Sequence, residues 1–159
     1  MKLFTDTLLD ELAAKANASP RLRAHQNIHQ SASDLVQRFF VAANRDSYFR
    51  PHRHLAKSEL AVALRGSFEL LTFDETGRVL DRYVIGEGSG NIAYEATVGT
   101  WHTLLALTDG CAFVEVKEGP YDPATAVDFA PWAPPEGDTR VARFQQWLRT
   151  AQRGTIYSE

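Results

Sequence analysis

The chain has 159 residues, 44% hydrophobic and 23% charged, with a formal net charge of −3, which suits one globular domain without a basic excess for nucleic acid. No apolar run approaches the roughly 20 residues that cross a bilayer, and Asp6, Asp10 and Glu11 interrupt the stretch that a signal peptide would keep apolar, so neither membrane insertion nor secretion is expected. The single cysteine, Cys111, fits a reducing compartment, and we expect a cytoplasmic protein.

The first expected element is a short amphipathic helix over residues 5–16, in which Leu8, Leu9, Leu12 and Ala16 recur at helical spacing. Beyond residue 36, short apolar or alternating runs are separated by turn residues about every ten positions, which is typical of an all-β barrel or sandwich. No helical pattern lies between these runs, so the strands should pair antiparallel. We expect strands near 36–43, 48–54, 58–65, 67–73, 79–85, 91–96, 101–107 and 111–117.

The C-terminal part of the chain changes in character. Residues 119–136, here called the strap, hold five of the seven prolines and should run extended over the barrel. A final helix over about 138–152 carries one apolar stripe that needs the barrel wall as its partner, formed by Val141, Phe144, Trp147 and Leu148. The pattern predicts a single domain over residues 1–159, with the barrel core at about 25–120 and a helix outside it at each end of the chain.

Two histidines and a glutamate have the spacing of metal ligands. His52 and His54 lie two residues apart on a predicted strand, so their side chains point to the same face. Glu59 begins the next strand and shares its parity with Ala61 and Ala63, whose small side chains suit the interior of a narrow barrel. Imidazoles and a carboxylate that converge from neighbouring strands are a ligand set for a divalent first-row metal.

The spacing also follows a known motif. The pattern His52-x-His54-x4-Glu59-x6-Gly66 resembles the first cupin motif, and Gly99-x-x-His102 resembles part of the second. This resemblance implies a double-stranded β-helix (jelly-roll) barrel with one divalent transition metal ion inside, which the ligand chemistry leaves open among Fe, Mn, Ni, Co and Zn. The implied ligands are His52, His54, His102 and Glu59, although in some cupins the equivalent carboxylate stands off the metal and acts as an acid or base. The family's usual proline and asparagine are replaced here by Thr97 and Ala106.

Longer segments resemble one family of cupins in particular. They include Asn27-Ile28-His29, Ser47-Tyr48-Phe49-Arg50-Pro51-His52-Arg53-His54, Trp101-His102-Thr103 and Glu115-Val116-Lys117-Glu118-Gly119-Pro120-Tyr121. Together they resemble the WbuC family of small cupin-fold metalloproteins over nearly the whole chain beyond the first helix. Members of that family are associated with bacterial surface-polysaccharide (O-antigen) gene clusters. The resemblance therefore implies a fold, a metal and a biological context, but no reaction.

Five further residues are candidates for the surroundings of the metal. Glu95 could orient a ligating imidazole or face the substrate, and Tyr48 could donate a proton near the barrel mouth, so these two are the catalytic candidates. A solvent-facing carboxylate and a core tyrosine with its hydroxyl paired are the alternatives. Asn27, His29 and Arg38 are the substrate-binding candidates, against surface placement for the first two and a structural ion pair for Arg38.

Three functions suit such a site. The first is a metal-dependent enzyme acting on a small polar metabolite, such as a carbohydrate or nucleotide-sugar derivative, with isomerisation or epimerisation favoured. The second is an Fe(II)-dependent dioxygenase, and the third is a non-catalytic module that binds or senses a sugar in a metal-dependent way. The expected partners are a small-molecule ligand and a second copy of the chain, in a homodimer formed through the region around residues 22–43.

Overall fold

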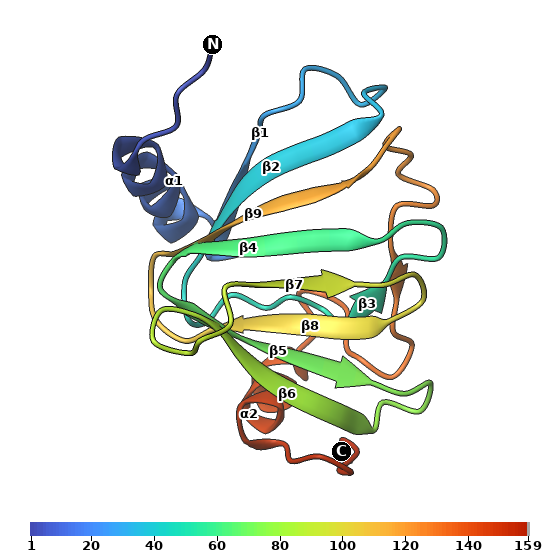
Figure 1. Ribbon diagram of the computed structural model, residues 1–159. Coiled ribbons are helices and arrows are strands. Elements are labelled where there is room, and N and C mark those ends of the chain that lie inside the picture. Colours follow the sequence, from blue (N-terminus) through green and yellow to red (C-terminus); the bar gives the residue numbers. More distant parts are fainter. Residues whose placement is uncertain (159) are drawn as a thin grey trace.

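In the computed structural model, which describes residues 1–158, two antiparallel five-stranded sheets face each other and enclose the barrel interior (Figure 1). The first sheet has the order β1-β2-β9-β4-β7 and the second has the order β10-β3-β8-β5-β6. Helix α1 lies against the outside of the first sheet, and α2 lies beyond the second (Figure 1). The all-β double-sheet barrel predicted from the sequence is therefore confirmed.

The elements have the following bounds: α1 Asp6–Ala18, β1 Arg23–Asn27, β2 Val36–Ala43, β3 His52–Arg53, β4 Glu59–Arg65, β5 Ser67–Phe73, β6 Val79–Gly86, β7 Ala93–Ala96, β8 Trp101–Ala106, β9 Cys111–Glu118, β10 Asp128–Phe129 and α2 Val141–Thr150. The strands β2 and β5 coincide with the expected ranges, whereas β1 and β10 were not expected. The predicted strand 48–54 is regular only over β3, because the segment before it forms a turn followed by irregular extended chain.

The N-terminal helix packs as its apolar spacing predicts. Leu12 and Ala16 are fully buried, and they contact Phe40 and Ala42 of β2 and Ala112 of β9 on the outer face of the first sheet. Burying a leucine side chain stabilises a fold by about 1.5–3 kcal/mol, so these contacts anchor α1 far more strongly than its intrinsic helix propensity would.

The C-terminal helix covers the outer face of the second sheet. Phe144 and Leu148 are fully buried and pack in one cluster with Leu71 of β5 and Trp101 of β8. The helix begins at Val141, a few residues later than expected, because the Asp138 side chain accepts the Arg140 backbone N–H in a turn ahead of it. The predicted partner of the apolar stripe, the barrel wall, is thus the observed one.

The glycine of the first motif makes the tight connection between β4 and β5. Gly66 has φ 66°, and a Cβ there would lie 2.7 Å from the Sγ of Cys111. Any side chain at this position would strain the backbone and also displace Cys111. The glycine therefore fixes where β4 ends, and so holds the register that brings Glu59 into the interior.

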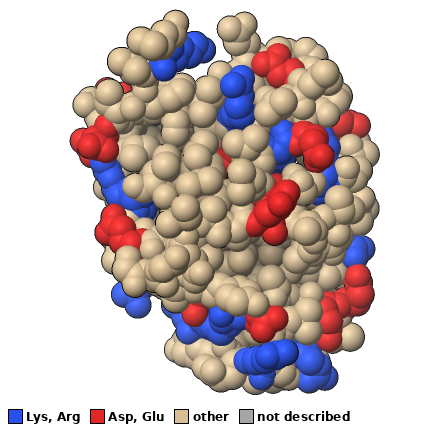
Figure 2. All heavy atoms as spheres, in the orientation of Figure 1, with Lys and Arg blue, Asp and Glu red and all other residues tan. Residues whose placement is uncertain are grey.

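Neither helix is long and apolar enough to cross a membrane, within the 158 residues described. Figure 2 shows positive and negative side chains interspersed on the face seen, with uncharged residues between them. This distribution agrees with the small net charge of −3.

Candidate metal centre

Four side chains from three strands and one connection converge inside the barrel. His52 lies on β3 with His54 just beyond it, Glu59 begins β4, and His102 lies on β8 directly opposite His52 in the strand register. One ligand atom from each lies within 4.8 Å of the others. His54, Glu59 and His102 are only 2–4% exposed. The alternation of the strands thus gathers the four residues that the motif spacing predicted.

The main chain fixes the orientation of all three imidazoles. The Nδ1 atoms of His52, His54 and His102 lie 2.9, 2.6 and 2.9 Å from the backbone carbonyl oxygens of Arg50, Ala126 and Thr100. A carbonyl oxygen can only accept, so each Nδ1 must carry the proton. In the neutral ring the Nε2 atom then has a free lone pair, and this is the usual way in which proteins orient histidine ligands of a metal.

These lone pairs face acceptor oxygens. The Nε2 of His54 lies 2.8 Å from Oε2 of Glu59, and the Nε2 of His102 lies 3.6 Å from Oε1. The Nε2 of His102 is buried and has no hydrogen-bond partner among residues 1–158. Nitrogen lone pairs and a carboxylate repel one another at such distances unless a cation lies between them. The donor set therefore fits a divalent first-row metal ion held by three imidazoles and one carboxylate.

Burial and neighbouring charges shape the protonation of this cluster. Burial, and then the charges of His102 and His54, lower the pKa of His52 to about 3, so its ring is neutral and able to ligate. Burial alone would raise the pKa of Glu59, but contacts with His102 and His54 and the nearby Lys117 ammonium hold it well below its usual value. A neutral imidazole and an ionised carboxylate are the forms that bind metal.

A cavity of about 600 Å³ opens beside the four residues. Its walls include β1, Glu59 of β4, and the positions of one parity that face the interior on β2 and β9. Phe39, Phe49 and Phe113 contribute apolar surface. Polar side chains from the first sheet and the strap complete the lining, including Asn27, Gln37, Tyr94, Glu115, Lys117 and Tyr121. The cluster is thus reachable by a ligand much larger than a water molecule.

A family model described as a domain of unknown function, DUF6016, matches residues 4–85, more than half of the chain. The chain belongs to the DUF6016 family. The matched part holds His52, His54 and Glu59, while His102 lies beyond it. No curated protein matches the chain.

Solved structures confirm the fold of this DUF6016 chain. An uncharacterised conserved protein with a double-stranded β-helix domain from Klebsiella pneumoniae is 14% identical, with a TM-score of 0.56 over 82% of this chain and 97% of that one. Oxalate oxidase in complex with glycolate is 14% identical, with a TM-score of 0.53 over 84% and 68%. The capsular polysaccharide assembling protein CapF from Staphylococcus aureus is 16% identical, with a TM-score of 0.54 over 70% and 32%. These similarities establish the double-stranded β-helix fold.

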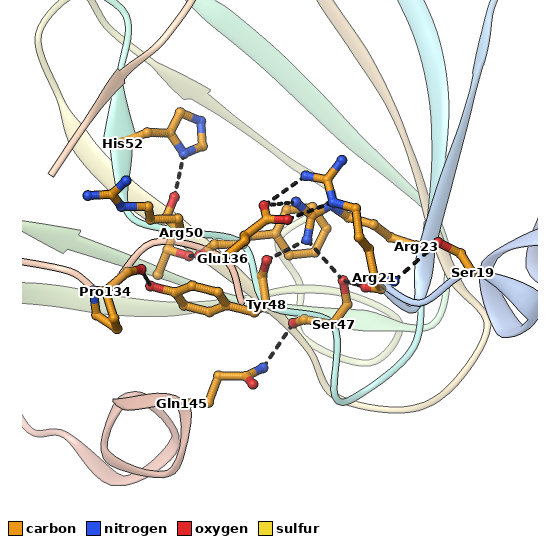
Figure 3. A network of polar contacts seen from close by, with 12 residues as sticks. Ser19, Arg21, Arg23, Ser47, Tyr48, Arg50, His52, Pro134, Glu136 and Gln145 are labelled. Atoms are coloured by element: carbon orange, nitrogen blue, oxygen red, sulfur yellow. Dashed lines mark hydrogen bonds and ion pairs between the residues drawn. The ribbon is translucent and has the colours of Figure 1, made fainter. Parts of the chain in front are cut away.

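The structure corrects the expected position of Tyr48 in this DUF6016 chain. Its side chain is 6% exposed and packs edge-on against Phe144 outside the cavity. Its hydroxyl donates to the Pro134 carbonyl oxygen at 2.9 Å, as Figure 3 shows, and burial raises its pKa. Parity with His52 could not be counted here, because residues 44–51 do not form a regular strand. Tyr48 is the paired core tyrosine of the alternative interpretation.

Glu95 and Arg38 also lie elsewhere than expected. Both side chains are exposed and neither lines the cavity. On β7 the register pairs Tyr94 with Ala61, so Tyr94 is the residue that faces the interior and Glu95 faces out. Arg38 is separated from the cavity by the same alternation on β2, where Phe39 faces inward. The proximity to the metal proposed for Glu95 is therefore wrong.

Asn27 and His29 do line the cavity. The Nδ1 of His29 lies 3.0 Å from the backbone N of Arg38 and 2.8 Å from its carbonyl oxygen, which ties the ring to β2. The main chain of the β1–β2 pair thus holds this part of the wall in place. Their roles in binding a substrate stay predictions.

Three buried or half-buried polar residues beside the metal cluster were not predicted to act there. Tyr94 donates its hydroxyl to Oε1 of Glu59 at 3.3 Å, and the Lys117 Nζ lies 3.5 Å from Oε2 of Glu59 and 2.6 Å from Oε1 of Glu115. Burial, and then the charge of Glu59, raise the pKa of Glu115, and the Lys117 ammonium opposes this rise. Lys117 follows Glu115 by two residues on one strand and lies opposite Glu59, so their shared parity identifies Lys117 only once the pairing of β9 with β4 is known.

Proposed function

We propose that this chain is a metal-dependent cupin enzyme that acts on a small polar metabolite, such as a carbohydrate or nucleotide-sugar derivative. One observation carries the proposal: three imidazoles with backbone-anchored Nδ1 atoms present Nε2 to Glu59 beside a cavity of about 600 Å³. A structural metal site would need no such cavity. The resemblance to the WbuC family supports a role in surface-polysaccharide (O-antigen) metabolism.

The size and lining of the cavity support a substrate of sugar size. Pockets of about 300–1,000 Å³ hold organic ligands of drug size, whereas a two-carbon acid would leave most of this cavity to water. The walls alternate phenylalanine rings with hydrogen-bonding side chains, as at Phe39, Gln37 and Lys117. A ligand with both C–H faces and several hydroxyl groups matches such walls.

The residues beside the metal cluster suit proton transfer at a polarised centre. A bound divalent ion would supply a Lewis acid that polarises a carbonyl or hydroxyl oxygen of the substrate. Where Glu59 stands off the metal, as the equivalent carboxylate does in some cupins, it can accept a proton, and the Tyr94 hydroxyl, which contacts Oε1, can pass one. The apolar rings around them restrict water. These are the requirements of an isomerase or epimerase that moves a proton at a carbon next to the polarised oxygen.

The test uses protein purified without an affinity tag and loaded in turn with Fe(II), Mn(II), Ni(II), Co(II) and Zn(II). Each form is incubated in D2O with monosaccharides and nucleotide-sugars, and proton NMR follows exchange of substrate C–H for deuterium while an electrode follows O2. The proposal predicts metal-dependent exchange or conversion that the H102A variant loses. Oxygen uptake with Fe(II) would indicate a dioxygenase instead. Metal-dependent binding with no exchange, product or O2 uptake would indicate a non-catalytic sugar-binding module.

A further inference from the structure

Burial of the Lys117–Glu115 pair is energetically unfavourable. Their side chains are only 14% and 10% exposed, and both lie on the interior face of β9. Removing a charged pair from water costs several kcal/mol per ion, and apolar residues of similar size often leave a protein equally or more stable. The next interior position on β9 is Phe113, and the β4 position opposite Glu115 is Ala61. The barrel could therefore close with apolar residues here, which points to a role in the site.

The pair is continuous with the metal cluster. The ammonium of Lys117 lies between Oε2 of Glu59, at 3.5 Å, and Oε1 of Glu115, at 2.6 Å. In the strand register Lys117 is opposite Glu59 and Glu115 is opposite Ala61, whose small side chain leaves space in front of the carboxyl group. A molecule that contacts the metal beside Glu59 can therefore extend along β9 to Glu115.

The pair keeps unused hydrogen-bonding capacity. Oε1 of Glu115 is buried and, apart from its 2.6 Å ion pair with Lys117, makes no hydrogen bond among the residues described. A carboxyl group offers about four acceptor positions and an ammonium offers three donors. Adjacent hydroxyl groups, each a donor and an acceptor, can satisfy both residues at once. A phosphate group has acceptors only and would bring its charge against Glu59 and Glu115.

Apolar rings flank the same part of the cavity. The Phe39 ring lies with its centroid 5.1 Å from Nζ of Lys117, and Phe113 follows Glu115 toward the barrel interior. The apolar rings can pack on the C–H face of a pyranose ring while its hydroxyl edge meets the polar pair. A short, flexible acid would leave these rings without a partner.

We infer that Lys117 and Glu115 form a substrate subsite that recognises adjacent hydroxyl groups of a neutral sugar ring, next to the oxygen that the metal holds. The inference rests on the proposed function and deepens it by naming the part of the site that selects the substrate. It assigns the pair to recognition of the hydroxyl groups and leaves the metal to its four ligands.

The test measures binding of the methyl glycosides of D-glucose, D-galactose and D-mannose, and separately of inorganic phosphate and UDP, to metal-loaded protein by calorimetry. E115Q keeps the shape of the side chain, and K117M removes the ammonium. Exposed residues of α1 provide matched controls, E11Q and K15M. Metal content is measured for every variant, so that lost binding is separated from lost metal.

At least one glycoside should bind the wild-type protein, and E115Q and K117M should each weaken it about tenfold or more with unchanged metal content, because each loses a hydrogen bond to a charged group. The control variants should stay within about twofold. Affinities unchanged in both cavity variants would overturn the subsite but leave the proposed function standing. Binding of phosphate or UDP alone would overturn the neutral-sugar assignment. Failure of the wild type to bind any glycoside would count against the carbohydrate substrate itself.

Discussion

The two ends of the barrel interior share the strands β4, β8 and β9 but have opposite chemistry. On β8, His102 lies at the polar end and Leu104 at the apolar end, two residues apart. On β9, Glu115 lies at the polar end and Phe113, two residues before it, lies at the apolar end. The apolar end includes Val41, Ala61, Phe68, Leu70, Ile85, Leu104 and Phe113, and the polar end includes His52, His54, Glu59, His102, Glu115 and Lys117.

Within one barrel interior, the residues at the apolar end stabilise the fold and those at the polar end form the candidate site. Phe68 is 1% exposed and packs edge-on against Phe113 with their ring centroids 5.2 Å apart. The apolar end thus gains both burial and aromatic contacts. The polar end holds buried charges that oppose folding unless they are paired or bound to a cation. We therefore expect substitutions at one end to change the free energy of unfolding, and at the other to change what the protein binds.

The largest effect is expected for the metal ligands. H52A, H54A and H102A should each abolish stoichiometric metal, because even removal of a group that only orients a ligand weakens metal affinity about 10–100-fold. E59Q should only weaken it, since three imidazoles remain. Elemental analysis of tag-free protein measures this. Unchanged metal in the histidine variants would contradict the assignment of the polar end.

At the apolar end, F68A should lower the free energy of unfolding by about 3–5 kcal/mol, through lost burial and the cavity left behind. Its folded fraction should keep the metal content of the wild type. Denaturant unfolding followed by circular dichroism measures the change. The control is L60A, at a half-exposed position on the outer face of β4, whose free energy of unfolding should stay within about 1 kcal/mol of the wild type. Loss of metal in folded F68A would show that the two ends are not independent.

The polar pair offers a sharper test of the comparison. In metal-free protein, the double variant E115L/K117M should unfold with a free energy equal to that of the wild type or about 1–4 kcal/mol higher, because buried ion pairs often cost more than apolar replacements. Urea titration of the metal-free forms measures it. A loss of 3 kcal/mol or more would mean that the pair is structural.

The smallest effect concerns the strap. Glu136 accepts from Nε and Nη2 of Arg21, both at 2.7 Å, and also pairs with Arg23 (Figure 3). Burial would raise the pKa of Glu136, but these arginines hold it below 4.5, so the contact stabilises the fold above that pH and is lost as the pH falls through the lowered pKa. We expect E136Q to lose about 1 kcal/mol at pH 7, allowing for solvent screening of this one-third exposed group.

The difference between E136Q and the wild type should shrink as the pH falls below 4.5. Thermal unfolding from pH 7 to 3 follows it, with the exposed E11Q as the control. A difference that stays constant over this range would indicate that the lost contact is not electrostatic.

The metal cluster could be predicted from the sequence, since the spacing of His52 and His54 uses only the alternation of one short strand, and Glu59 and His102 follow the cupin motif. Its surroundings could not. Glu95 and Tyr94 are neighbours on a strand of four residues, and only its pairing with β4 decides which of them faces inward. That pairing is a long-range contact which no local pattern records.

An irregular segment caused the misplacement of Tyr48. The parity of Tyr48 was counted across residues 44–51, which are not a regular strand, so the count had no meaning there. The two-residue strand β10 owes its extended form to pairing with β3 and has no apolar alternation of its own. Regular strands longer than five residues, such as β2 and β5, were placed correctly because the alternation of their side chains repeats several times along the strand.

The three carbonyl oxygens that orient the imidazoles belong to the main chain, and this has a consequence for how the protein can vary. The acceptors at Thr100 and Ala126 persist whatever side chain these positions carry, provided that the backbone keeps its path. The orientation of the histidine ligands is therefore set by the path of the backbone and not by the side chains of the residues that supply the carbonyl groups. A systematic substitution scan scored for metal retention should find residues 100 and 126 permissive beside intolerant histidines. A chain cut after β9 would keep all four ligands yet lose the anchor of His54.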